Sequence, residues 1–274
     1  MIETIQSMFA LTFITRAVIV GSLVSLCAAL LGVSLVLKRY AMIGDGLSHV
    51  GFGILTVSVA FGLLDYSLQI TIPGVIIFAI ILLKIGNNSN IKSDSAIALI
   101  SSSALAIGVA VTSVTTGMNT DVCNFMFGSI LVMSKSDVHL SIAVSIIVAI
   151  LFIIYYRKLF AITFDENFAK AIGLKVNRYT SLIAILTAVT IVIGMRMMGT
   201  MLISSIIIFP ALTSMRVFKS FKQVVISSGI VSVVAFLIGI YLSYLYSIST
   251  GAVIVLVNLL LFIIFSIMKK IIYE

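Results

Sequence analysis

Charged side chains are scarce in this sequence. Asp, Glu, Lys and Arg together make up 9% of its 274 residues, while hydrophobic residues make up 61%. A soluble domain carries about 25% charged residues, so this chain lacks the polar surface that a water-soluble core requires. We therefore predict an all-α polytopic membrane protein. At about 20 residues per span, the length allows about 8–9 transmembrane helices in one bundle, forming a single domain over residues 1–274.

The motifs of several enzyme classes are absent as well. Without G-x-x-x-x-G-K-[ST], the chain does not cradle ATP phosphates itself. It contains neither H-E-x-x-H nor G-x-S-x-G, and its 2 histidines stand far apart, which argues against an intramembrane protease. The 2 cysteines, Cys27 and Cys123, form neither a metal-type pair nor a disulfide framework. We expect no enzyme activity, no permanently bound cofactor, and any ATP hydrolysis in a separate chain.

Positive charge is distributed in short clusters between the hydrophobic runs. The net charge of +8 could suggest nucleic acid, but a binding face for it would not be divided in this way, so we expect no nucleic-acid partner. Cytoplasmic loops of membrane proteins carry such clusters. With nine spans and the N-terminus outside, 14 of the 17 Lys and Arg residues are cytoplasmic, and only Arg16, Lys135 and Arg196 are not. We predict a multi-pass plasma-membrane protein with a cytoplasmic C-terminus.

The hydrophobic runs define the predicted spans. Residues 1–15 are interpreted as a short interfacial helix, and 116–137 as a partly re-entrant segment, because it is too polar to span. Pro210 removes one helical hydrogen bond and predicts a kink or a break in its span. Broken helices often line the substrate paths of transporters. The predicted spans are 17–37, 41–64, 67–85, 95–115, 138–156, 179–196, 197–215, 224–246 and 251–268.

The second span carries an aspartate and a histidine four positions apart, Asp45 and His49. On a helix, such residues share one face with Cβ atoms about 5–6 Å apart. A carboxylate oxygen and an imidazole nitrogen can then reach one divalent ion at about 2.0–2.2 Å. A carboxylate inside a membrane needs a partner or a role. We predict a metal site; the alternative is that Asp45 caps the helix and His49 hydrogen-bonds a neighbouring helix.

Small residues surround this pair and allow other helices to approach closely. Four further polar residues lie toward the outer face and are interpreted as interfacial, with Asp121 and Cys123 the best additional ligands among them. The small residues are Gly44, Gly46, Ser48, Gly51 and Gly53, and the outer polar residues are Asp121, Cys123, Asp137 and His139.

The longest polar loop, 157–178, contains the pattern of a short amphipathic helix. Thr163 and Glu166 match a capping box, and Gly173 can supply the left-handed C-cap. A capped amphipathic helix in a loop either packs on its own bundle or docks on a partner. Its apolar positions are Phe164, Phe168, Ala169 and Ile172, and its charged positions are Asp165, Glu166 and Lys170.

Five segments, in order, resemble the ABC-type metal permeases that carry zinc, manganese and iron into bacteria. The resemblance covers about 17–268 and is greatest to zinc-named Gram-positive members. Two positions depart from the family pattern: Ser249 stands where a Pro usually precedes Thr-Gly, and Cys123-Asn124 stands where a His is frequent. The segments are KRYAMIGDGLSHVGFG, KSDSAIALISSSALAIGV, DVCNFMFGSILVMSKSDV, FDENFAKAIGLKVNRY and GMRMMGTMLISSIIIFPALTSMRV.

The resemblance implies a permease subunit of an ATP-driven importer for divalent transition metals, with zinc favoured. In such permeases two identical or related copies form the pore, a cytoplasmic ATP-binding subunit docks on a coupling helix, and an extracellular metal-binding lipoprotein delivers the ion. Asp45 and His49 match the in-pore position for Zn²⁺ or Mn²⁺ as substrate, and residues 164–173 match the coupling helix. Two alternatives are a secondary ion-coupled transporter with this pair as a proton relay, and a scaffold with a purely structural pair.

Overall fold

The computed structural model describes residues 12–63, 66–88, 93–115 and 135–273, and their secondary structure is helical. No β-strand occurs in these ranges. The helices are α2 Thr12–Leu37, α3 Ile43–Ala60, α4 Ser67–Asn88, α5 Ser93–Val114, α7 Lys135–Phe164, α8 Glu166–Ala171, α9 Val176–Met198, α10 Thr200–Val217, α11 Phe221–Tyr246 and α12 Thr250–Tyr273.

The described part of the chain has 8 helices that are long and apolar enough to cross a membrane. Helix α4 adds a shorter apolar stretch, Ser67–Leu83. The predicted all-α bundle with 8–9 spans is therefore confirmed. Most of the segment 116–137, with Asp121 and Cys123, and most of the interfacial helix predicted at 1–15 lie outside the described residues.

Several predicted boundaries differ from the structure. Helix α2 begins at Thr12 and not at Ala17, so residues 12–15 belong to this helix and not to a separate interfacial helix. Helix α7 does not end at Tyr156 but continues to Phe164, because Arg157 and Lys158 end the apolar run without interrupting the helical hydrogen bonds. Helix α10 passes through Pro210, so the break predicted there is not found. The interruption lies earlier, at Gly199, whose φ of 82° and ψ of 163° separate α9 from α10. That backbone region is open essentially to glycine alone.

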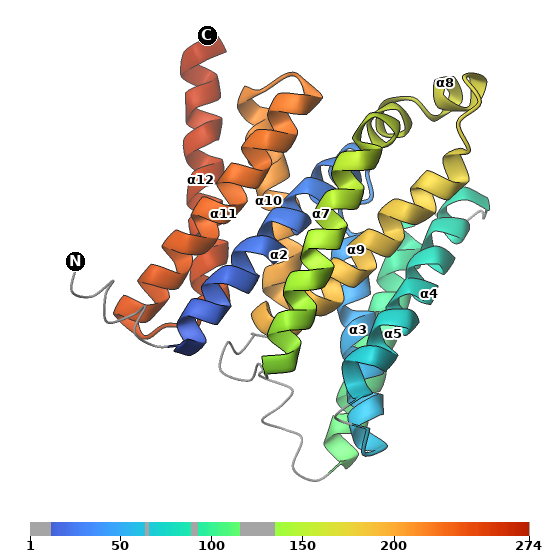
Figure 1. Cartoon of the computed structure of the whole chain (residues 1–274), viewed down its shortest axis with the longest axis vertical. Coiled ribbons are helices and arrows are strands. Elements are labelled where there is room, and N and C mark those ends of the chain that lie inside the picture. The colour runs from blue at the N-terminus through green and yellow to red at the C-terminus, as the bar shows by residue number, and fades with distance from the viewer. Residues whose placement is uncertain (1–11, 64–65, 89–92, 116–134, 274) are drawn as a thin grey trace.

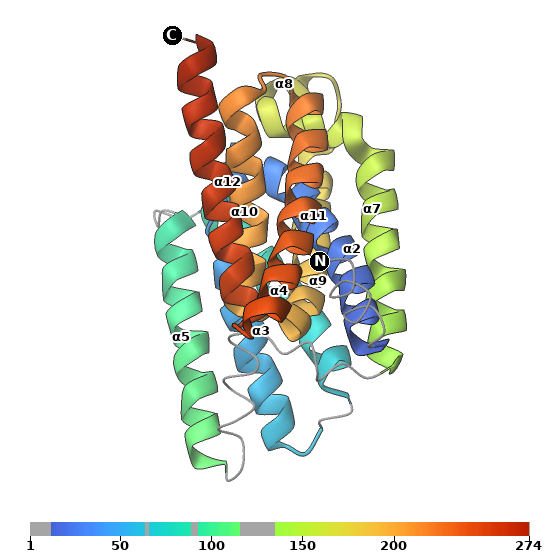
Figure 2. The same cartoon turned by 90° about the vertical axis from the view of Figure 1, so that its left-hand side faces the viewer.

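The bundle consists of two groups of helices joined by a central layer. Helices α10, α11 and α12 contact one another, as do α3, α4 and α5. Between these groups lie α2, α7 and α9 (Figure 1). The short helix α8 lies at one end of the bundle, at the same end as the C-terminus (Figure 2). The arrangement brings the start of α3 into contact with α10 and α5.

Helix α3 packs closely on its neighbours because its contact positions have no Cβ. A Cβ on Gly53 would lie 2.7 Å from the carbonyl oxygen of Ala104 in α5, and one on Gly46 would lie 2.7 Å from Ile97. Larger side chains at these positions would force the two helices apart. The prediction that small residues around Asp45 allow close helix approach is therefore confirmed.

Candidate metal-transit site and coupling helix

Asp45 lies in the first turn of α3. The residue that caps this helix is Met42, which makes no side-chain capping bond. The carboxylate of Asp45 is thus not used as a cap, and its side chain is 42% exposed. Negative charge in a first helical turn is favoured by the helix dipole. The position leaves the carboxylate oxygens of Asp45 accessible.

His49 faces Asp45 from the next turn. Its Nε2 lies 3.7 Å from Oδ1 of Asp45, which is too long for a direct hydrogen bond. Its Nδ1 is buried and has no hydrogen-bond partner among the described residues. The alternative in which His49 bonds to a neighbouring helix is therefore not observed. Nε2 of His49 and Oδ1 of Asp45 thus lie near each other without forming a hydrogen bond.

The spacing of these two atoms suits a shared metal ion. Two ligands at about 2.1 Å from one ion, at a tetrahedral angle, are about 3.4 Å apart. The observed 3.7 Å between His49 Nε2 and Asp45 Oδ1 differs from this by a few tenths of an ångström. The distance between the two side chains is therefore compatible with a shared ion without any change in the backbone of α3.

Ser204 of α10 completes the polar surroundings of Asp45. Its Oγ lies 3.4 Å from Asp45 Oδ1 and 3.0 Å from the carbonyl oxygen of Thr200, to which its hydroxyl donates. The sequence did not indicate Ser204, because it stands in an apolar run with no recognisable pattern around it. Within the described ranges, no three His, Cys, Asp or Glu side chains converge, so Asp45 and His49 are the side chains of these types that meet here.

Of the polar residues predicted at the outer face, the structure describes Asp137 and His139, and both lie on α7, away from Asp45 on α3. Asp137 begins α7 and its Oδ2 lies 3.3 Å from Arg196 at the end of α9. His139 is exposed on α7. Because Asp137 is bound to Arg196, it is interpreted as a structural residue that joins α7 to α9, and not as a ligand.

The helix α8 begins two residues later than predicted. Asp165, and not Thr163, is its N-cap, and its Oδ1 accepts hydrogen bonds of 2.9 Å from the backbone of Asn167 and of Phe168. Thr163 is still part of α7 and donates to the carbonyl oxygen of Leu159. The capping-box prediction was wrong because α7 extends through Phe164, which places the first free backbone N–H groups after Asp165.

The other end of α8 is closed as predicted. Gly173 has a φ of 82°, its N–H donates to Lys170, and the N–H of Leu174 donates to Ala169. These two bonds define a Schellman motif. The predicted single apolar face is divided, however, since Ala169 is buried while Phe168 and Ile172 are 58% and 55% exposed. Exposed apolar side chains on a capped helix indicate a docking surface.

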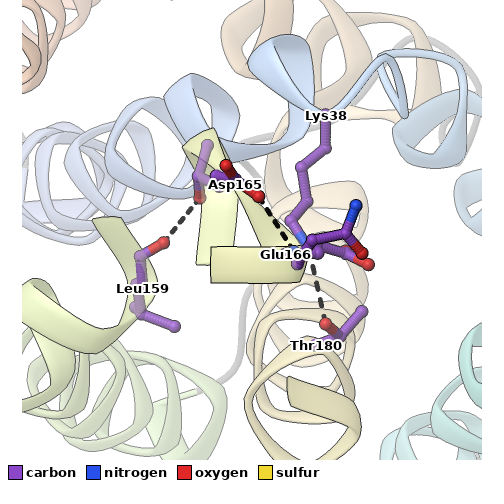
Figure 3. A network of polar contacts seen from close by, with 7 residues as sticks. Lys38, Leu159, Asp165, Glu166 and Thr180 are labelled. Atoms are coloured by element: carbon purple, nitrogen blue, oxygen red, sulfur yellow. Dashed lines mark hydrogen bonds and ion pairs between the residues drawn. The ribbon is translucent and has the colours of Figure 1, made fainter. Parts of the chain in front are cut away.

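Lys38 links α8 to the start of α3. The chain turns after α2 at Arg39, which has a φ of 61°, and the side chain of Lys38 is directed inward with only 6% exposed. Its Nζ lies 2.7 Å from Oε1 of Glu166 and 3.4 Å from the hydroxyl of Thr180 in α9 (Figure 3). In sequence, Lys38 reads only as the positive end of a span, so this contact was not predicted.

The sequence matches the ABC 3 transport family over residues 10–269. The chain belongs to this family. It is 32% identical to the "Manganese import system permease protein ScaB" of Streptococcus gordonii over 96% of the chain and 93% of that protein. It is 29% identical to the "High-affinity zinc uptake system membrane protein ZnuB" of Haemophilus influenzae, over 93% and 97%.

A solved structure has the same fold. "PsaBC from Streptococcus pneumoniae in complex with Fab" matches with a TM-score of 0.86 and 31% identity, over 97% of this chain and 95% of that one. The ABC 3 transport family member described here is therefore a multi-pass membrane permease and not an enzyme. The relatives are named for manganese as well as for zinc.

Proposed function

We propose that this permease carries a divalent transition-metal ion inward and that Asp45 and His49 bind the ion in transit. The observation that carries the proposal is the 3.7 Å separation of their donor atoms, with Nδ1 of His49 unpartnered. A bare dication cannot cross a low-dielectric core, because the loss of its hydration is too costly. Ligands in the pore must therefore replace water during passage.

The number of ligands suits transport better than storage. A closed structural zinc site uses four protein ligands, whereas one copy of this chain offers a carboxylate and an imidazole. Conduction requires a site that binds strongly enough to admit the ion and weakly enough to release it. We expect two copies, or one copy and a sibling permease, to form the pore, so that the half-exposed Asp45 faces the partner across the ion path.

Zinc remains our expected cargo. A carboxylate and an imidazole suit either metal, and at equal geometry Zn²⁺ binds more strongly than Mn²⁺. ScaB is named for manganese and ZnuB for zinc, so both ions belong in the experiment. Competition between the two, measured on the same complex, decides between them.

Energy is expected to come from a cytoplasmic ATP-binding subunit that docks on α8. Support comes from the exposed Phe168 and Ile172 on a helix whose two ends are fixed by Asp165 and Gly173. The distribution of Lys and Arg supports an outside N-terminus and a cytoplasmic α8. We expect an extracellular metal-binding lipoprotein to deliver the ion at the opposite end.

The deciding experiment is uptake of radioactive zinc and manganese, normalised to assembled complex. Asp45→Asn keeps the shape and removes the charge, and His49→Ala removes the nitrogen; each should reduce uptake at least tenfold while the ATPase still co-purifies. His139→Ala, the only other histidine, is the matched control and should transport normally. Near wild-type uptake by Asp45→Asn would end the metal-site interpretation. Uptake that needs no ATPase would favour the proton-relay alternative.

A further inference from the structure

A groove of about 810 Å³ lies between α2, α7 and α11. Its walls are apolar for most of their length, and the three helices contribute side chains from far apart in the sequence. The residues that define it are Leu26 and Leu30 of α2, Phe152 and Tyr156 of α7, and Lys222 and Ile230 of α11. The volume falls in the range of ligand pockets, about 300–1,000 Å³.

The floor of the groove is fixed by contacts between α2 and α11. Ser232 donates to the carbonyl oxygen of Ser25 at 2.9 Å, and Ser228 to that of Ala29 at 3.3 Å. Gly229 lies between these serines, where a Cβ would come within 2.9 Å of Leu26. The two helices are therefore held close, and the missing side chain leaves space beside them. The groove is therefore formed by the close packing of α2 against α11.

One end of the groove is basic. Of the lining residues, only Lys222 is charged, and it lies beside Phe221, whose ring meets that of Tyr156 at 5.5 Å. Arg157 follows Tyr156 and stands one turn beyond Ile153, which also lines the groove. Both basic side chains are exposed, and neither forms an ion pair with any residue of the described ranges.

The length of the groove matches one leaflet of a bilayer. The lining residues of α11 run from Lys222 to Val234, and at 1.5 Å per residue this stretch is about 18 Å long. Half of a hydrocarbon core is about 15 Å. The basic end lies on the side of α8, because Phe160 and Phe164 near the end of α7 contact Phe221. This is the side that the distribution of Lys and Arg assigns to the cytoplasm.

We propose that the groove is a binding site for an anionic phospholipid of the cytoplasmic leaflet. An acyl chain lies along the apolar walls, and the headgroup phosphate is bound by Lys222 and Arg157, with the hydroxyl of Tyr156 at the same level. A second copy is the other candidate occupant. Because the proposed pore residues Asp45 and His49 lie on α3, which contributes no lining residue, we assign the groove to a lipid. The pore face and the groove therefore belong to different helices. The proposal does not depend on the identity of the transported ion.

The test is native mass spectrometry of the purified permease–ATPase complex with equal amounts of phosphatidylglycerol and phosphatidylcholine of the same acyl chains. Wild type should retain phosphatidylglycerol preferentially. Lys222→Gln and Arg157→Gln should each weaken its binding about fivefold, the effect of one basic residue at a membrane surface, without affecting phosphatidylcholine. Ile230→Trp, at a site 59% exposed, should fill the groove and reduce binding of both lipids.

Lys270→Gln is the matched control, because Lys270 is an exposed residue of α12 on the same side of the membrane and lies outside the groove. It should bind both lipids as wild type does. Equal retention of the two lipids by wild type, or unchanged phosphatidylglycerol binding by the Lys222→Gln and Arg157→Gln double variant, would overturn the proposal. A disulfide between two copies carrying Ile230→Cys, absent from the parent chain, would show that a second copy covers this face and would also overturn it.

Discussion

The ammonium nitrogen of Lys38 lies 2.7 Å from a carboxylate oxygen of Glu166, although 128 positions separate the two residues in sequence. Lys38 is the first residue of the turn that leads from α2 toward Asp45, and Glu166 begins α8. The helix on which we expect the ATPase to dock is therefore bound directly to the segment that precedes the proposed transit site. A displacement of α8 would therefore act on Lys38, as well as on the ends of α7 and α9 that α8 contacts.

The first prediction concerns this ion pair. Glu166→Gln should leave the buried ammonium of Lys38 without a counter-charge, and Lys38→Met should remove it. Because Glu166 is 43% exposed, solvent screens the pair, and each change should destabilise the complex by only about 1–2 kcal/mol. Uptake per hydrolysed ATP should fall further than this loss of stability explains. Thermal unfolding and coupled uptake measure the two effects separately.

A charge reversal provides the control for this pair. Lys38→Glu with Glu166→Lys should recover part of the lost uptake, whereas each single reversal should not. Lys269→Gln, on an exposed part of α12, should change neither quantity. Additive effects in the double variant would contradict a direct interaction between the two side chains.

The second prediction concerns the start of α8. Asp165→Ala should remove both capping hydrogen bonds, to Asn167 and to Phe168, and destabilise this short helix by about 1 kcal/mol. The amides of α8 should then exchange hydrogen faster. Thr163→Ala is the matched control, since Thr163 bonds only within α7, and it should leave exchange in α8 unchanged. Equal effects of the two changes would contradict the assignment of Asp165 as N-cap.

The third prediction concerns sidedness. A cysteine in place of Lys170 should react with a membrane-impermeant thiol reagent only after cells are permeabilised, because α8 is expected in the cytoplasm. A cysteine in place of Ile248, which is 53% exposed between α11 and α12, should react in intact cells. The opposite pattern would show that the N-terminus is inside and would require the ATPase to dock elsewhere.

Hydropathy and spacing predicted most of what is local in this structure. Apolar runs located the spans, although α7 continues to Phe164 beyond its predicted end at Tyr156. The four-residue spacing of Asp45 and His49 placed them on one face of α3. Helix ends were predicted less accurately. Threonine is a common N-cap residue, but Thr163 still belongs to α7, which ends at Phe164. Pro210 likewise predicted a kink or a break, and of these the break is absent because α10 is continuous through it.

What could not be predicted depends on contacts between distant segments. Lys38 meets Glu166 because the end of α2 packs beside α8, which follows α7 far along the chain, and nothing in the local sequence marks that contact. Ser204 approaches Asp45 because α10 crosses α3 at that level, which an apolar run does not reveal. Hydrophobic pattern sets which segments are buried, but side-chain partners across the bundle are set by packing.

Gly199 is the only residue between α9 and α10, so the two helices can change their relative orientation through very few backbone torsions. Since α9 ends at Met198 and α10 begins at Thr200, only the φ and ψ angles of one residue separate two long helices. The end of α9 is anchored through Arg196 to Asp137, and α10 carries Ser204 opposite Asp45. No loop connects the two helices. A movement of Ser204 away from Asp45, relative to α9, would therefore be a rotation of α10 about the φ and ψ bonds of Gly199.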